Sequence, residues 1–86
     1  MADIVVYTKN YCPYCVRAKM LLADRGLQFK EICNDNDMER RQQMLSLTGG
    51  ASYTVPQILI NDQLIGGCSD LEALIRNGQL DALVGA

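Results

Sequence analysis

The pattern of apolar and polar positions predicts alternating strands and helices in the first part of the chain. The β-branched run at residues 4–7 is typical of a buried strand. Residues 16–25 contain no Gly or Pro, and they predict a helix that Gly26 ends. One face of this helix carries apolar side chains, at Cys15, Ala18, Leu21 and Leu22. Residues 27–32 then predict a second strand, parallel to the first because a helix joins the two.

A second helix is expected after the turn residues at 34–37. It would run from residue 37 or 38 to residue 47 or 48 and end at the Gly49-Gly50 pair. We expect Met38 and Leu45 on its apolar side, with Met44 beside them. Its polar residues would mostly face solvent.

The last part of the chain predicts a hairpin followed by helix. Residues 57–60 and 63–66 are short strand-like runs joined by a tight turn at Asn61-Asp62. Ser69 and Glu72 match the S-x-x-E capping box, which predicts the start of a third helix there. A short last helical turn is expected at residues 80–84. The order β-α-β-α-β-β-α predicts one α/β domain, residues 1–86, with a four-stranded mixed sheet flanked by helices on both faces.

Composition narrows the class of protein. With 49% hydrophobic and 21% charged residues, the chain is globular rather than disordered. A net charge of −2 argues against a nucleic-acid partner, and no apolar run is long enough to span a membrane. Without a signal peptide we expect a cytoplasmic protein, and a monomer by default. Four cysteines and no histidine in a reducing compartment indicate catalysis or metal binding rather than a static disulfide framework.

Two of the cysteines lie where the first strand gives way to the first helix. Unpaired N–H groups and the dipole at a helix start favour a thiolate there, and Lys9 adds a positive charge. We therefore expect Cys12 to be the exposed nucleophile. Cys15, one turn further in, would be more buried and would resolve a mixed disulfide on Cys12. Pro13 suits the first helical position. A structural bridge or half of a zinc site is the alternative, because the spacing also suits zinc.

Three motifs give the chain a resemblance to a known family. They are Cys12-Pro13-Tyr14-Cys15, Thr54-Val55-Pro56 and Gly66-Gly67-Cys68-Ser69-Asp70. In this order and spacing they resemble the dithiol glutaredoxins, most closely the small bacterial type, over essentially the whole chain. The resemblance implies a thioredoxin-like fold and a cis bond before Pro56. It also implies glutathione as a co-substrate, with no bound cofactor and no metal.

The resemblance further implies a glutathione site. Val55 would offer its backbone to an extended glutathione, with Thr54, Pro56 and Gly67 in the same site. Tyr14 would flank the sulfur, although it could instead serve only packing. The γ-glutamyl end would bind at Cys68, Ser69 and Asp70, where the third helix begins. N–H groups at this helix start would bind its carboxylate, and Asp70 would bind its ammonium group. Lys9 would meet a glutathione carboxylate.

One position departs from the family pattern. Many relatives carry a basic residue shortly before Thr-Val-Pro, whereas residues 49–53 here contain none. The glycyl carboxylate of glutathione would then be bound by Lys9, or by Arg41 or Gln42 of the second helix.

Two further cysteines leave alternatives open. Cys33, at the end of the second strand, is expected to be a small buried residue, with an exposed accessory thiol as the alternative. Cys68 could be buried in the same way, or could form secondary mixed disulfides beside the glutathione site.

These observations predict a glutathione-dependent thiol–disulfide oxidoreductase that acts on protein disulfides and protein–glutathione mixed disulfides. One alternative is a thioredoxin-like carrier recycled by a flavoprotein reductase, which the residues around Asp70 argue against. The other is an iron–sulfur protein whose cluster is held by Cys12 and glutathione. Cys33 and Cys68 lack the paired spacing of a Cys₄ site, which argues against a cluster held by the chain's own cysteines. Pro13 also stiffens the loop that a bridging cluster would occupy.

Overall fold

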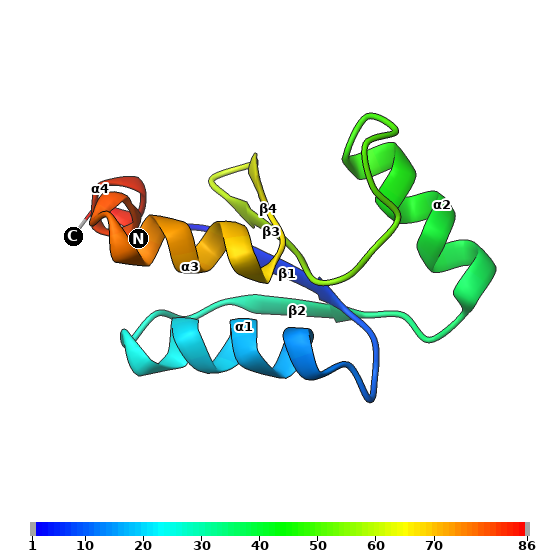
Figure 1. The fold of residues 1–86 in the computed structure, drawn as a ribbon, viewed down its shortest axis with the longest axis horizontal. Helices are drawn as coiled ribbons and strands as arrows, with labels where there is room; N and C mark the ends of the chain where they lie inside the picture. Colours follow the sequence, from blue (N-terminus) through cyan, green and yellow to red (C-terminus); the bar gives the residue numbers. More distant parts are fainter. Residues whose placement is uncertain (1, 86) are drawn as a thin grey trace.

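The computed structural model describes residues 2–85, and its four strands form one mixed sheet. The strand order is β2-β1-β3-β4 (Figure 1). The central strand β1 is parallel to β2 and antiparallel to β3, while β3 and β4 form an antiparallel hairpin. The bounds of the strands are Ile4–Thr8 for β1, Lys30–Cys33 for β2, Gln57–Ile60 for β3 and Gln63–Gly66 for β4. The predicted mixed sheet is thereby confirmed.

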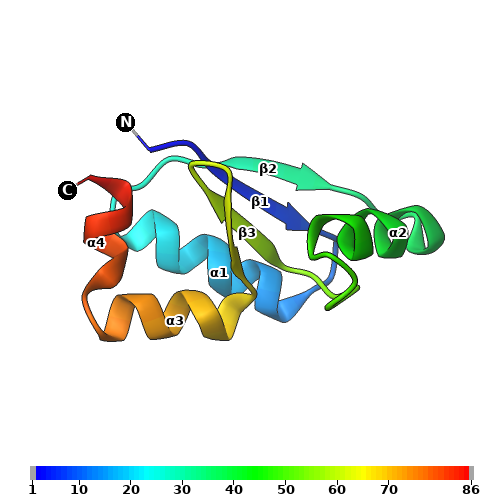
Figure 2. The same cartoon turned by 90° about the horizontal axis from the view of Figure 1, so that it is seen from above.

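Helices α1 and α3 pack side by side against the sheet (Figures 1 and 2). Helix α1 spans Pro13–Asp24, α3 spans Cys68–Arg76, and the short α4, Gln79–Val84, packs against α3. Their inner faces and the sheet enclose a core that includes Ile4, Val6, Ala18, Leu22, Ile58, Ile60, Leu71 and Leu80. None of the helices in residues 2–85 has the length and apolar character needed to cross a bilayer.

The topology brings the two loops that follow β1 and β2 to one end of the sheet. Strands β1 and β2 are parallel, so the loops that follow them leave from the same end (Figure 2). Helix α2, Asp37–Leu47, lies at that end, away from α1 and α3. The backbone N–H of Asn10 and the side chain of Asp35 tie the two loops together through a 2.8 Å hydrogen bond.

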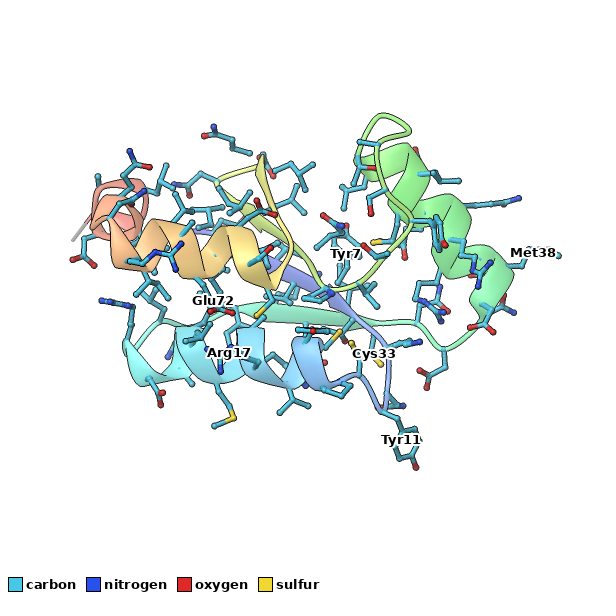
Figure 3. The ribbon with its side chains drawn as sticks, in the orientation of Figure 1. Tyr7, Tyr11, Arg17, Cys33, Met38 and Glu72 are labelled. Atoms are coloured by element: carbon cyan, nitrogen blue, oxygen red, sulfur yellow. The ribbon has the colours of Figure 1, made fainter. Side chains whose placement is uncertain are left out.

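Helix α2 buries only one of the three side chains that its sequence predicts to be apolar and inward-facing. Met38 is 74% exposed and Leu45 is 39% exposed, whereas Met44 and Arg40 are buried (Figure 3 labels Met38). The buried stripe therefore runs through positions 40 and 44, one helical turn apart. It can include an arginine because the Arg40 guanidinium donates to the Asn34 carbonyl and to Asp37. The expected apolar side of this helix was therefore wrong for Met38 and Leu45 and right for Met44.

Two further boundaries differ from the prediction. Strand β2 begins at Lys30 rather than at residue 27. Helix α3 begins at Cys68, so Ser69 already lies within its first turn and the expected Ser69–Glu72 capping box is wrong. Instead, the Asp70 carboxylate accepts the N–H of Gly67, the residue that caps the helix, at 2.9 Å. Glu72 faces α1 rather than the start of its own helix, and Arg17 binds it there.

Candidate active site

Cys12 occupies the N-cap position of α1, at the end of the loop that follows β1. The backbone turns sharply before it, because Tyr11 has a φ of 58°. The Tyr11 side chain is fully exposed and extends away from the fold (Figure 3). The Cys12 sulfur accepts the backbone N–H of Cys15 at 3.3 Å, and Pro13 takes the first helical position. The sulfur thus replaces the hydroxyl or carboxylate oxygen that usually satisfies a helix start.

The two cysteines of this turn have different environments. Cys15 is 1% exposed, and its burial, together with its hydrogen bond to Cys12, raises the pKa of its thiol to about 12. Cys15 therefore stays protonated at neutral pH. Cys12 is 7% exposed, so its sulfur is more enclosed than the exposed thiol expected from the sequence. The neighbouring Val55 contributes to this enclosure, since its carbonyl oxygen lies 3.9 Å from the Cys12 sulfur.

The segment before β3 forms the wall opposite Cys12. The peptide bond between Val55 and Pro56 is cis, as the resemblance implied. The buried Gln57 side chain donates to the Thr54 carbonyl at 3.0 Å and holds the segment in place. Thr54 and Val55 separate two depressions in the surface, and both residues line each of them.

The first depression, here called the nucleophile pocket, has a volume of about 290 Å³. Its lining includes Lys9, Cys12, Arg40, Arg41, Tyr53 and Val55. Arg40 is buried and its guanidinium lies 2.6 Å from the Asp37 carboxylate, which lowers the pKa of that carboxyl group. Lys9 and Arg41 make no ion pair within residues 2–85. Among the described residues, the pocket beside Cys12 therefore presents two cations without a carboxylate partner.

The second depression, here called the helix-start pocket, lies at the beginning of α3 and has a volume of about 440 Å³. Tyr14 lines it together with Thr54, Val55, Pro56, Gly67, Cys68 and Ser69. Asp70 is next to this lining and binds Gly67, but it is not part of it. Gln42 lines neither pocket.

A polar cluster beneath the helix-start pocket links α1 to α3. Arg17 donates to Glu72 at 2.9 and 3.2 Å, and the two side chains point toward one another (Figure 3). The Cys68 thiol lies 3.5 Å from the same carboxylate. Burial, followed by the hydrogen bond to Glu72, raises the pKa of Cys68. Cys68 is 5% exposed and is therefore the buried thiol of the two alternatives.

The family model of the glutaredoxins matches residues 4–65. The chain belongs to the glutaredoxin family. A glutaredoxin of Pseudomonas aeruginosa is 49% identical over 86 residues, covering the whole of both chains. Glutaredoxin 3 of Escherichia coli K12 is 48% identical over 84 residues, covering 98% of this chain and 99% of the relative. A crystal structure of a buckwheat glutaredoxin–glutathione complex superposes with a TM-score of 0.85, at 30% identity, covering 98% of this chain and 77% of that chain.

Glutaredoxins are glutathione-dependent thiol–disulfide oxidoreductases. Membership of this family confirms the predicted thioredoxin-like fold and the predicted enzyme class. The paired cysteines of the family motif are adjacent in this chain, joined by the hydrogen bond between the Cys12 sulfur and the Cys15 N–H.

Some features of this glutaredoxin site were missed or misjudged from the sequence. Cys33 is exposed, not buried, because it ends an edge strand in which only Ile32 is even half-buried. Arg40 and Tyr53 line the nucleophile pocket, and neither was singled out. An aromatic residue directly before Thr-Val-Pro was the available signal for Tyr53. No local pattern marks Arg40, because its burial depends on how α2 is docked.

Within residues 2–85, no group of three or more potential metal-binding side chains lies close together. Cys33 and Cys68 are therefore not gathered with the Cys12–Cys15 pair into a four-cysteine site.

Proposed function

We propose that Cys12 is the nucleophile and Cys15 the resolving thiol of glutathione-dependent disulfide reduction. The observation that carries this proposal is the hydrogen bond from the Cys15 N–H to the Cys12 sulfur at the head of α1. A donor already directed at that sulfur stabilises negative charge on it, and the helix dipole acts in the same direction. The buried, protonated Cys15 lies one turn away, within the same helix.

The reaction begins when the Cys12 thiolate attacks the glutathione sulfur of a protein–glutathione mixed disulfide. The old S–S bond breaks, the client leaves as a thiolate that takes up a proton, and a Cys12–glutathione disulfide forms. A glutathione thiolate then attacks this disulfide and releases oxidised glutathione together with the Cys12 thiolate.

Protein disulfides require the second cysteine. Cys12 attacks one client sulfur, and Cys15 gives up its proton as it attacks the resulting mixed disulfide. The fully reduced client is released, and a disulfide between Cys12 and Cys15 remains on the enzyme. Two glutathione molecules then reduce this disulfide.

Glutathione would lie across both pockets. We place its backbone along Val55, as an added strand, with Thr54 and Pro56 in the shared wall and Tyr14 beside the sulfur. Its γ-glutamyl carboxylate would meet the N–H groups at the start of α3, at Gly67, Cys68 and Ser69, with Asp70 near its ammonium. Its glycyl carboxylate would face Lys9 and either Arg41 or Gln42, of which only Arg41 lines the pocket.

We further propose that residues 1–86 act as one domain and as a monomer in the cytoplasm, on disulfide-containing or glutathionylated proteins. Glutathione serves as co-substrate, and no bound cofactor, metal, membrane or nucleic acid takes part. The net charge of −2 supports the absence of a nucleic-acid partner.

Two cysteine variants test the proposal. Cys12→Ser should abolish the reduction of a glutathionylated peptide in a coupled assay with glutathione, glutathione reductase and NADPH. Cys15→Ser should keep this activity and lose the reduction of an intramolecular protein disulfide. Retained activity in Cys12→Ser would refute the assigned nucleophile, and loss of both activities in Cys15→Ser would refute its restricted role. Recycling of the oxidised protein by a flavoprotein reductase in place of glutathione would favour the carrier alternative.

A further inference from the structure

The loop between α2 and the Thr-Val-Pro segment is fixed by side-chain hydrogen bonds at both ends. Thr48 caps α2, and its hydroxyl oxygen lies 2.8 Å from the carbonyl oxygens of Met44 and Ser52. The same oxygen accepts the Ser52 N–H at 3.0 Å. The Ser52 hydroxyl in turn accepts the Thr54 N–H at 3.1 Å. Tyr53 lies between two anchored residues, so its position at the pocket is set by the loop.

The Tyr53 ring lies beneath the guanidinium of Arg41. The carbon at the centre of the guanidinium is 5.1 Å from the centre of the ring, which is within the range of a cation–π contact. Both residues line the nucleophile pocket with Cys12. A cation–π contact is made to the ring and needs no hydrogen-bond acceptor. It therefore does not occupy the N–H groups of Arg41 with another acceptor, and these are the groups that bind a carboxylate through two parallel hydrogen bonds.

The neighbouring residues of α2 are not equivalent to Arg41. The charge of Arg40 is already balanced by Asp37, and its other contact is the Asn34 carbonyl. Gln42 has no net charge and lines neither pocket. Of these three consecutive residues, Arg41 alone offers an unpaired cation to the pocket, as judged over residues 2–85.

We propose that Tyr53 is a positioning residue that holds Arg41 ready for the glycyl carboxylate of glutathione. The inference rests on the proposed glutathione site and deepens it. A free arginine side chain loses rotamer freedom when it binds, so a contact that orders it beforehand lowers the cost of binding. Tyr53 thereby contributes to affinity for glutathione through Arg41, in a chain that lacks a basic residue at positions 49–53.

The test measures kcat/KM for a glutathionylated peptide at saturating glutathione. A cation–π contact at an exposed site is worth about a two- to five-fold change, so Tyr53→Leu should lower kcat/KM by that factor through KM. Tyr53→Phe retains the ring and should restore the efficiency. Arg41→Gln removes a charge-assisted pair and should lower kcat/KM about ten-fold. Gln43→Ala, at an exposed position of the same helix, serves as the matched control.

Two double comparisons, called cycles below, distinguish a positioning role of Tyr53 from a general effect of its substitution on the structure. In the first, adding Tyr53→Leu to Arg41→Gln should cause no further loss, because Tyr53 acts through Arg41. In the second, the peptide carries glutathione whose glycine ends in a carboxamide. The wild type should lose efficiency on this substrate, and Tyr53→Leu should then match the wild type.

A Tyr53→Leu loss that persists on the carboxamide substrate, or in the Arg41→Gln background, would overturn the inference. So would a Tyr53→Leu protein as efficient as the wild type. These comparisons remain decisive if Tyr53→Leu also lowers the melting temperature, because both cycles compare the same folded variants. A wild-type protein inactive on any glutathionylated peptide would refute the proposed function itself. A wild-type protein equally efficient on the carboxylate and carboxamide substrates would refute the inference alone.

Discussion

At the scale of single residues, the site depends on two identical side chains in unlike surroundings. Cys12 lies at the helix start, where the Cys15 N–H binds its sulfur. Cys15 is one turn further in, and burial is the main cause of its raised pKa, about 12. Because the folded value lies above that of a free cysteine, the neutral thiol of Cys15 is the form favoured by folding.

This difference predicts selective alkylation. The native reduced protein, treated with iodoacetamide at pH 7, should be modified at Cys12 at least about ten-fold faster than at Cys15, since the thiolate is the reactive form. Peptide mapping by mass spectrometry after short reaction times measures both rates. Unfolding in urea should remove the difference. Comparable rates at the two positions in the native protein would contradict the assignment of roles.

Some properties of single residues follow from the local sequence, and others depend on how distant elements pack. The positions and order of Cys12 and Cys15 follow from the strand-to-helix pattern, which depends on local sequence. The exposure of Cys33 and Met38 does not, because it depends on which edge a strand occupies and which side of a helix docks. Tyr53 and Arg41 are twelve residues apart in sequence, and their contact arises from a loop whose hydrogen bonds no local pattern indicates.

At the scale of elements, the start of α3 depends on a close approach between the backbone of Gly66 and the carboxylate of Asp70. Gly66 has a φ of +118°, and a side-chain carbon at this position would overlap the Asp70 carboxylate. That carboxylate caps the helix through the Gly67 N–H. Gly66 therefore permits the turn from β4 into the helix that lines the helix-start pocket.

Gly66→Ala should accordingly be much more disruptive than an alanine at another glycine of positive φ. We expect Gly66→Ala to lower the free energy of unfolding by about 3 kcal/mol, from backbone strain and a displaced cap together. Gly50→Ala is the control, since its φ is +87° and no atom lies within 4 Å of the added carbon. It should cost only about 1–2 kcal/mol. Urea unfolding measures both, and equal losses would mean that the Asp70 contact is unimportant.

Elements defined by local chemistry were predicted well. Strands β3 and β4 have the bounds that the hairpin pattern indicates, because the Asn61-Asp62 turn fixes them from within. The start of α3 was misplaced because Ser69 and Glu72 satisfy the capping pattern without forming the cap. Glu72 is instead bound by Arg17, which is 55 residues away in sequence. Such competition from another element cannot be read from a four-residue motif.

At the scale of the whole molecule, carboxylates help to join the elements. Glu31 of β2 accepts hydrogen bonds from Thr8 of β1, at 2.6 Å, and from Lys19 of α1, at 3.0 Å. The Thr8 hydroxyl, followed by Lys19, lowers the pKa of Glu31. Arg17 similarly lowers the pKa of Glu72, which joins α3 to α1. Both groups have pKa values below those of an unfolded chain, so the unfolded chain binds their protons more readily.

The stability contributed by these groups is complete above the ordinary glutamate pKa of about 4.3 and is lost as the pH falls below it. We expect the free energy of unfolding in urea to be lower at pH 3.5 than at pH 7. Glu31→Gln removes one titrating group, so it should reduce that difference by a few tenths of a kcal/mol, as is usual for partly exposed pairs. An unchanged pH dependence in Glu31→Gln would show that Glu31 does not contribute to acid sensitivity.

The open position of Cys33, at the outer edge of the sheet, has a practical consequence for work with this protein. Air or oxidised glutathione can reach this sulfur without any conformational change, so stored preparations will accumulate adducts and cross-linked pairs unrelated to turnover. A chain with Ser in place of Cys33 would lack this background. It would be a suitable parent for the comparisons described above. Cys68 is buried, so a gain or loss of accessible thiols could then be attributed to the Cys12–Cys15 pair.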